Sequence, residues 1–332
     1  MNQTAQQVEQ RLERFAQRYA AVRGQLAGVI VGHAEAIDQV MVGLLTGGHI
    51  LLEGVPGLGK TLLVRTLAGS LDLAFSRIQF TPDLMPADIT GTDLVVQTES
   101  GGRDFRFRPG PIFANLVLAD EINRATPKTQ SAVLEAMQEG SVTVGRTTHP
   151  LAEPFFLLAT QNPLELEGTY PLPEAQLDRF AYKVVVQPPS EDELVEIFAR
   201  TTVGETPAAS KVADGTALLE MRRFVREAAV SDVISRYVAR LIRATHPESP
   251  TAAELVRKYV RYGGSPRAGQ ALLLGGKARA LAAGRLHVDF DDIRPLIGPA
   301  LRHRLILNFD AEADGVSADQ VIDQAANSVS TH

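Results

Sequence analysis

The hydrophobic pattern at the start of the chain predicts two helices. Apolar residues recur at alternating spacings of four and three, which places them in one stripe along a helix that Gly28 would end. These residues are Val8, Leu12, Phe15, Tyr19, Val22 and Leu26. The stripe holds fewer heptads than a coiled coil needs, so we expect a helix docked on the rest of the protein, with a coiled coil as the alternative. A second periodic segment, residues 35–45, predicts another helix, which stops at Gly47 and Gly48.

From residue 49 the pattern changes to short, continuous apolar runs. Such runs are typical of strands that are buried on both faces of a parallel sheet. They cover residues 50–52, 75–80, 116–119, 155–159 and 183–186. Helical patterns lie between several of them, at 62–71 and at 126–139, where Thr126 can cap the helix and Pro127 takes its first position. Strands that alternate with helices predict βαβ units, and so an α/β fold with a parallel sheet.

Two stretches interrupt this rhythm with alternating residues around central glycines. In the first, residues 94–98 and 105–108 flank the segment Ser100-Gly101-Gly102. In the second, residues 142–144 and 147–149 flank Gly145-Arg146. Both patterns predict β-hairpins inserted into the α/β core.

After Pro188-Pro189 the strand pattern nearly vanishes and helical patterns follow one another. They cover residues 191–199, 217–228, 233–243, 268–283 and 290–296. The predicted division is an N-terminal helix (1–28), an α/β domain (29–189), a smaller all-helical domain (190–309) and a C-terminal tail (310–332). The tail is polar and poor in large apolar residues, so we expect it to fray at its end.

Composition and charge exclude several classes of function. The 332 residues include no cysteine, so disulfides, thiolate metal sites and thiol nucleophiles are excluded. A net charge of −6 disfavours a surface built to neutralise nucleic-acid phosphates, without excluding a local basic groove. The N-terminus lacks the basic start and apolar core of a secretory signal, and no run approaches the about 18 apolar residues that span a bilayer. We therefore expect a cytoplasmic protein without membrane insertion.

The segment Gly54-Val55-Pro56-Gly57-Leu58-Gly59-Lys60-Thr61 fits the phosphate-binding loop pattern and lies between a predicted strand and a predicted helix. Its glycines let backbone N–H groups turn toward a phosphate, and the helix N-terminus adds a favourable partial charge. Lys60 would reach the β- and γ-phosphates of ATP, and Thr61 would ligate Mg²⁺. The alternative, a glycine-rich turn without function, is disfavoured by the flanking strand and helix.

Polar residues follow two of the other predicted strands. Asp120 and Glu121 end one apolar run, where Asp120 would hold the magnesium shell and Glu121 would polarise the attacking water. Asn162 follows another run and could hydrogen-bond the γ-phosphate or that water. By themselves, the acids would form a solvated turn and Asn162 would initiate a turn before Pro163, but the phosphate loop favours the functional interpretation. The candidate nucleotide-binding residues are Gly54, Pro56, Gly57, Gly59, Lys60, Thr61, Leu62 and Asp120.

Together these motifs resemble an AAA+ ATPase, and they resemble its MoxR branch closely. The residues that carry the likeness to MoxR are Asp120-Glu121-Ile122-Asn123-Arg124-Ala125, Pro127-Lys128-Thr129-Gln130, Glu135-Ala136-Met137-Gln138-Glu139, Arg77-Ile78-Gln79-Phe80-Thr81-Pro82-Asp83-Leu84, Gln176-Leu177-Asp178-Arg179-Phe180 and Gly264-Ser265-Pro266-Arg267-Ala268. The likeness spans residues 28–309, and this many ordered motifs make it specific. The first helix and the tail carry no family motif.

The resemblance implies a ring, usually a hexamer of identical chains, with ATP at the subunit interfaces and an arginine of the neighbour completing each site. Arg179 matches this arginine finger, its alternatives being a pair with Asp178 or a surface charge, and Arg124 is a weaker interface candidate. Arg267 matches the second sensor arginine, which in the family reaches the nucleotide from the helical lid of its own subunit; an exposed helix arginine is the alternative. The implied catalytic set is Glu121, Asn162, Arg179 and Arg267, with Thr61 and Asp120 at the metal.

The two hairpins gain a role from the same resemblance. The first is similar to the insert in the second helix of this branch, and the second is similar to the hairpin before the strand of Asn162. Both would face the pore of the ring or one rim. Arg106, Arg108 and Arg146 would then lie near a bound client polypeptide, or they would only keep exposed hairpins soluble.

The function that the resemblance implies is a chaperone-like remodelling ATPase. MoxR-like proteins are thought to act on client proteins, often with partners that carry a von Willebrand factor A domain, and to assist maturation, assembly or metal-cofactor insertion. One alternative is a nucleotide-controlled scaffold with slow hydrolysis, against which the intact Glu121 argues. The other is a nucleic-acid translocase, which the acidic balance disfavours.

Overall fold

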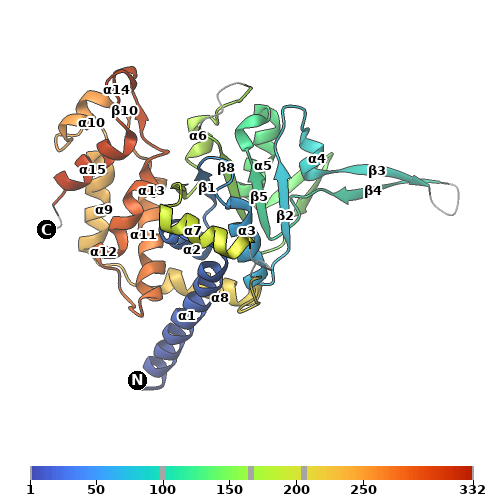
Figure 1. The fold of residues 1–332 in the computed structure, drawn as a ribbon, viewed down its shortest axis with the longest axis horizontal. Helices are drawn as coiled ribbons and strands as arrows, with labels where there is room; N and C mark the ends of the chain where they lie inside the picture. Colours follow the sequence, from blue (N-terminus) through green and yellow to red (C-terminus); the bar gives the residue numbers. More distant parts are fainter. Residues whose placement is uncertain (1, 98–101, 164–167, 203–207, 331–332) are drawn as a thin grey trace.

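A five-stranded parallel sheet forms the centre of the computed structural model, which describes residues 2–97, 102–163, 168–202 and 208–330 (Figure 1). Its strands, in spatial order, are β2 (Phe75–Gln79), β5 (Leu116–Asp120), β8 (Phe156–Gln161), β1 (Ile50–Glu53) and β9 (Tyr182–Val185). Every neighbouring pair is parallel. The five apolar runs of the sequence predict these five strands, and the structure confirms all of them.

Strand β2 differs from the expectation of burial on both faces. It lies at one edge of the sheet, and only Ile78 of its five residues is buried, whereas all five residues of β5 are buried. An edge strand tolerates polar side chains, which explains why Arg77 and Gln79 lie within this run.

Helices cover both faces of the sheet, because successive strand residues point to opposite sides. Leu52 and Leu158 belong to one hydrophobic cluster, while Leu51 and Leu157 belong to another on the opposite face. The helices of the first cluster include α1 (Asn2–Val29), α2 (Ala34–Thr46) and α3 (Lys60–Ser70), and those of the second are α4 (Pro86–Thr90) and α5 (Pro127–Glu139).

The helices predicted at 35–45, 62–71 and 126–139 are confirmed as α2, α3 and α5. Pro127 occupies the start of α5 as expected. The hydroxyl of Thr126, however, lies 3.3 Å from that of Thr129 and accepts no capping bond from a backbone N–H.

Both hairpins are present. The first is β3 (Gly91–Gln97) with β4 (Arg103–Pro109), a ribbon that projects away from the core in Figure 1. Two residues of its predicted turn, Ser100 and Gly101, lie outside the described residues. The second is β6 (Ser141–Val144) with β7 (Thr147–Pro150). The rings of Phe107 in β4 and His149 in β7 stack with centroids 3.8 Å apart, so the two hairpins are joined near their bases.

The chain after β9 is mainly helical, as predicted. Its helices are α7 (Glu191–Thr202), α8 (Gly215–Glu227), α9 (Asp232–Ala244), α10 (Glu254–Tyr259), α11 (Pro266–Ala282), α12 (Phe290–Ile293), α13 (Ile297–Leu301), α14 (Phe309–Ala313) and α15 (Ala318–Ser328). Helix α8 packs beside α1, where the rings of Phe15 and Phe224 lie 6.1 Å apart. The helices from α9 onward form the lid, which lies opposite the β3–β4 ribbon in Figure 1. The all-helical prediction misses one short antiparallel pair, β10 (Val260–Tyr262) with β11 (Ile306–Leu307).

The segment predicted as a separate tail is part of the lid in the structure. Helix α15 packs against α9, α10 and α13. Its residues Val321, Ile322 and Ala325 are buried in the same hydrophobic cluster as the lid, which fixes the helix as far as Ser328. Among the described helices, none combines the length and apolar character that crossing a membrane requires.

Candidate functional site

The phosphate loop connects the end of β1 to the start of α3. Gly57 and Gly59 have positive φ angles of 86° and 75°, which favour glycine because a Cβ atom would be strained there. Lys60 folds back across the loop, and its Nζ donates a hydrogen bond of 2.5 Å to the carbonyl oxygen of Gly54. The first N–H groups of the 11-residue helix α3 have no partner within the helix, so the loop presents donors and a partial positive charge. This cradle fits a polyphosphate group.

Three carboxylates act electrostatically on the ammonium group of Lys60. Partial burial lowers the pKa of Lys60, and the charges of Asp120, Glu121 and Glu53 act in the opposite direction. One cation therefore lies near three anions that come from the ends of β1 and β5.

Asp120 is the last residue of β5 and is 8% exposed. The Oγ1 of Thr160 donates to its Oδ1 at 2.6 Å, and Arg77 donates to its Oδ2 from Nε at 2.9 Å and from Nη2 at 2.7 Å. A carboxylate oxygen accepts two hydrogen bonds, so Oδ1 keeps room for one more donor, such as a water of a magnesium shell.

Glu121 follows directly, in the left-handed region with φ of 57°. Its backbone N–H donates to Thr160 Oγ1 at 2.8 Å, so one hydroxyl of β8 fixes both acids. Gln79 Nε2 and Arg124 Nη1 donate to its Oε2 at 2.7 and 3.0 Å. Two side chains thus hold the carboxylate, and a third holds the backbone of the same residue.

Asn162 follows β8 and is 6% exposed. The backbone N–H of Gly54 lies 3.4 Å from the carbonyl oxygen of Gln161, which joins the start of the phosphate loop to the end of β8. Because β5, β8 and β1 are parallel neighbours, the predicted residues of these three strands meet at the same edge of the sheet.

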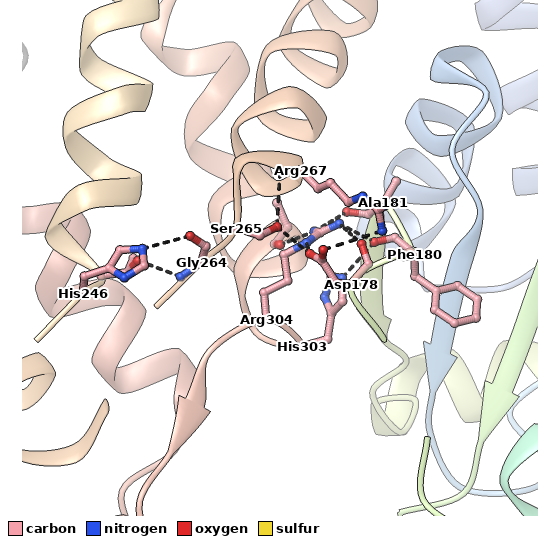
Figure 2. A network of polar contacts seen from close by, with 11 residues as sticks. Asp178, Phe180, Ala181, His246, Gly264, Ser265, Arg267, His303 and Arg304 are labelled. Atoms are coloured by element: carbon pink, nitrogen blue, oxygen red, sulfur yellow. Dashed lines mark hydrogen bonds and ion pairs between the residues drawn. The ribbon is translucent and has the colours of Figure 1, made fainter. Parts of the chain in front are cut away.

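Arg179 and Arg267 form their contacts at a second place, around the loop that follows α6. Arg179 follows the short helix α6 (Glu174–Leu177), and its Nη1 donates to the carbonyl oxygen of Leu134 in α5 at 3.2 Å. Arg267 lies in the first turn of α11, and its Nη1 is 3.6 Å from the carboxylate of Asp178, the residue before Arg179 (Figure 2). The structure therefore places the lid arginine beside the loop that carries Arg179.

A small recess adjoins the phosphate loop. It is lined by Gly59 and Lys60 and by a mostly apolar set: Ile30, His33, Ala36, Leu58, Leu63 and Val186. The recess is apolar and lies beside the phosphate cradle, but as it stands it is too small to hold the base of a nucleotide.

The protein offers oxygen ligands for a hard cation at this edge, the hydroxyl of Thr61 and the carboxylate of Asp120. Magnesium commonly takes only one or two protein ligands and completes its shell with phosphates and water, so this pair fits Mg²⁺. Within the described parts of the chain, no group of three or more His, Cys, Asp or Glu residues is arranged to hold a metal by itself.

The sequence motifs identify the acids but not the residues that hold them. Arg77, Gln79 and Thr160 contact Asp120 or Glu121 from neighbouring strands. The first two lie within the quoted MoxR-like motifs, and the alternation of β2, which brings Arg77 and Gln79 to one face, is the signal that could have found them.

Comparisons with known proteins agree with this geometry. Residues 49–182 match the profile of the ATPase family associated with various cellular activities (AAA), and residues 252–325 match an AAA lid domain. The chain is 44% identical over 302 residues to chaperone MoxR1 of Mycobacterium tuberculosis, covering 91% of this chain and 79% of that protein. It is 31% identical over 313 residues to protein MoxR of Paracoccus denitrificans, covering 88% and 89%. A crystal structure from Cytophaga hutchinsonii, of a protein proposed to be an ATPase, superposes with a TM-score of 0.90 at 40% identity and 98% coverage of both chains.

Proposed function

The chain belongs to the MoxR family of AAA ATPases, and on that premise we propose that it remodels client proteins in a ring whose ATP sites are shared between subunits. Membership of this family implies ATP hydrolysis. The relative from M. tuberculosis is named a chaperone, which supports a polypeptide as the object of the remodelling.

The observation that carries the proposal is the meeting of five polar residues at one edge of the sheet. Lys60 would bind the terminal phosphates, while Thr61 and Asp120 would hold Mg²⁺. When bound, the metal supplies positive charge that offsets the charge developing on the phosphates. Glu121 would accept a proton from the attacking water, and Asn162 would orient that water or the γ-phosphate.

The position of Arg179 supports a shared site. Its guanidinium rests on α5, whereas the phosphate loop and the acids form their contacts at the carboxyl edge of the sheet. A transferring phosphoryl group needs a further cation, and an arginine supplied by a neighbour is one established solution. We propose that Arg179 is this finger in a homo-hexamer and that Arg267 is the second sensor arginine, which would reach the nucleotide of its own subunit from the lid.

The client is proposed to bind at the hairpins. Val95 and Phe105 are paired across β3 and β4 and are 58% and 73% exposed, so one face of the ribbon offers an apolar surface, while Arg106 lies on the other face. We propose a von Willebrand factor A domain protein as the partner and maturation, assembly or metal-cofactor insertion as the outcome. These assignments derive from the family resemblance.

A slow, nucleotide-controlled scaffold is the second candidate. The observation in its favour is that both acids are engaged, Asp120 by Arg77 and Glu121 by Gln79 and Arg124. Such contacts suit a resting state. They also suit a motor between turnovers, so the rate of steady-state hydrolysis separates the two candidates.

Replacing Glu121 tests the catalytic assignment. Glu121→Gln keeps the size of the side chain but removes the base, so turnover should fall at least about tenfold while ATP binding is retained, because the phosphate loop is untouched. Phosphate release and the binding of a fluorescent ATP analogue measure the two effects. Glu312→Gln, an exposed lid position, serves as the control. Near-normal hydrolysis by Glu121→Gln would refute the assignment.

A further inference from the structure

One buried side chain of the lid donates hydrogen bonds to main-chain carbonyl groups on both sides of Arg179. Arg304 follows α13, and its side chain is 2% exposed. Its Nη2 donates to the carbonyl oxygens of Asp178 at 3.0 Å and Phe180 at 2.6 Å, and its Nη1 donates to that of Ala181 at 3.0 Å. Figure 2 shows these bonds converging from the lid on the loop of residues 178–181.

The remaining donors of Arg304 are also engaged. Nε donates to the Oδ1 of Asp178 at 2.8 Å, and Nη1 donates to the carbonyl oxygen of Ala300 at 2.5 Å. Together with the three bonds to the carbonyl oxygens of Asp178, Phe180 and Ala181, these two bonds use all five N–H groups of the guanidinium. The side chain therefore cannot rotate without breaking several hydrogen bonds. A lysine at this position could not reproduce the fork, because its single ammonium group has no fixed planar geometry.

Other lid residues reinforce the same loop. Ser265 Oγ donates to Asp178 Oδ1 at 2.6 Å, and Arg267 Nη1 forms an ion pair with the other carboxylate oxygen, Oδ2, at 3.6 Å. His303 Nε2 lies 2.9 Å from the carbonyl oxygen of Phe180, which requires the proton to be on that nitrogen. Two lid segments, 265–267 and 303–304, therefore hold the residues that flank Arg179.

We propose that Arg304 is a positioning residue for Arg179: from the lid it fixes the core loop around the finger, and so determines where Arg179 of one subunit enters the ATP site of the next. The inference rests on the proposed role of Arg179 as a finger in trans. Its consequence is that Arg304 acts on the hydrolysis of the neighbouring subunit, although it touches no ATP.

The first test is Arg304→Lys, which keeps the positive charge beside Asp178 but loses the fork. We expect kcat to fall at least about tenfold while the KM for ATP changes by no more than about twofold, because the phosphate loop is intact. Arg302→Lys is the matched control. Arg302 comes from the same lid segment and also bonds a core carbonyl, but its hydrogen bonds go to Lys183 and Asp319 instead of residues 178–181. The turnover of this variant should therefore stay near that of the wild type.

Mixing subunits separates positioning from general damage. Arg304→Lys subunits have an intact phosphate loop, whereas Lys60→Ala subunits have an intact finger loop. Mixed assemblies, verified by native mass, should therefore hydrolyse ATP faster than the sum of the two variants alone. A mixture without any gain would mean that the substitution damages the subunit's own site, and it would overturn the inference.

A parallel mixture of Arg179→Ala with Lys60→Ala makes the two possible failures distinguishable. If it gains activity and the Arg304→Lys mixture does not, only the role of Arg304 is wrong. If neither mixture gains activity, the shared site is wrong and the role of Arg304 fails with it. Asp178→Asn, which keeps an acceptor for Nε but weakens the pair, gives the same prediction and replaces Arg304→Lys if that variant does not assemble.

Discussion

At the scale of single residues, the acids of the site are held by polar neighbours on adjacent strands. Arg77 places two N–H donors on the same oxygen of Asp120, and Thr160 holds the other oxygen. A guanidinium so placed neutralises a carboxylate that would hold Mg²⁺, so the arginine and the metal compete for the same charge.

This competition predicts the effect of Arg77→Met, which keeps the apolar stem and removes the charge. The concentration of magnesium at half-maximal ATP hydrolysis should fall by about threefold or more, because a cation close to a metal site opposes metal binding. Titration of magnesium at saturating ATP measures it, and Arg103→Met on the distant β4 is the control. An unchanged or higher requirement for magnesium would show that Arg77 orients Asp120 instead of competing for it.

The motifs reveal the site residues that are close together in the sequence, but not their remote partners. Lys60 and Thr61 lie in one loop, and Asp120 and Glu121 end one strand, so a linear pattern reveals them. Arg77 reaches Asp120 across 43 positions of the chain, and Arg304 reaches Asp178 across 126. The alternation of β2 brings Arg77 to one face of its strand, but no sequence pattern pairs it with Asp120, because the packing of separate elements creates this contact.

At the scale of elements, His49 links three parts of the core. It precedes β1, its Nε2 lies 3.0 Å from the carbonyl oxygen of Met137 in α5, and its Nδ1 accepts a hydrogen bond of 3.0 Å from the backbone N–H of Leu157 in β8. The ring is therefore neutral, with its proton on Nε2. Burial lowers the pKa of His49 to about 4, because the charged ring would be desolvated.

This linkage predicts a loss of stability in acid. The fold requires the neutral ring, and above the unfolded pKa of about 6.5 the unfolded chain also carries it neutral, so folding carries no cost of deprotonation. As the pH falls from 6.5 toward 4, the unfolded chain binds a proton that the folded protein does not, and the fold loses stability. Between pH 7 and pH 5 the free energy of unfolding should fall by about 2 kcal/mol on account of this residue. The pKa of buried His303 is lowered as well, so it adds to the loss in the same direction.

The variant His49→Gln isolates this contribution, because its amide can bond both neighbours without titrating. We expect the free energy of unfolding, measured with denaturant, to change less between pH 7 and pH 5 in His49→Gln than in the wild type. The difference between the two changes should be about 2 kcal/mol. His287→Gln, at an exposed position, should leave the dependence unchanged. An equal pH dependence in wild type and His49→Gln would contradict the assignment.

The sequence pattern reveals the elements that contain many large apolar residues, either in a continuous run or at helical spacing. The five central strands are predicted because buried parallel strands are continuous apolar runs. Helix α15 is missed because it contains few large apolar residues, although its core residues Val321, Ile322 and Ala325 lie on one helical face. The capping box of Ser317 and Gln320 is the signal that marks its start.

At the scale of the whole molecule, two kinds of contact join the core and the lid, one apolar and one polar. One hydrophobic cluster runs from the sheet through α2 and α11 to the last helix, α15. The polar network of Asp178, Arg304 and Arg267 then fixes the lid to the loop of Arg179. A movement of the lid would therefore carry this loop with it, which suits a protein that converts hydrolysis in one subunit into movement of the next.

The measurement that tests the shared site most directly is the specific rate of ATP hydrolysis as a function of protein concentration. Oligomer size is recorded by native mass on the same samples with ATP and magnesium. If sites are completed by a neighbouring Arg179, specific activity rises with concentration in step with the formation of rings. A monomer that hydrolyses ATP as fast as the assembled protein would contradict the shared site and the role of Arg179 in trans.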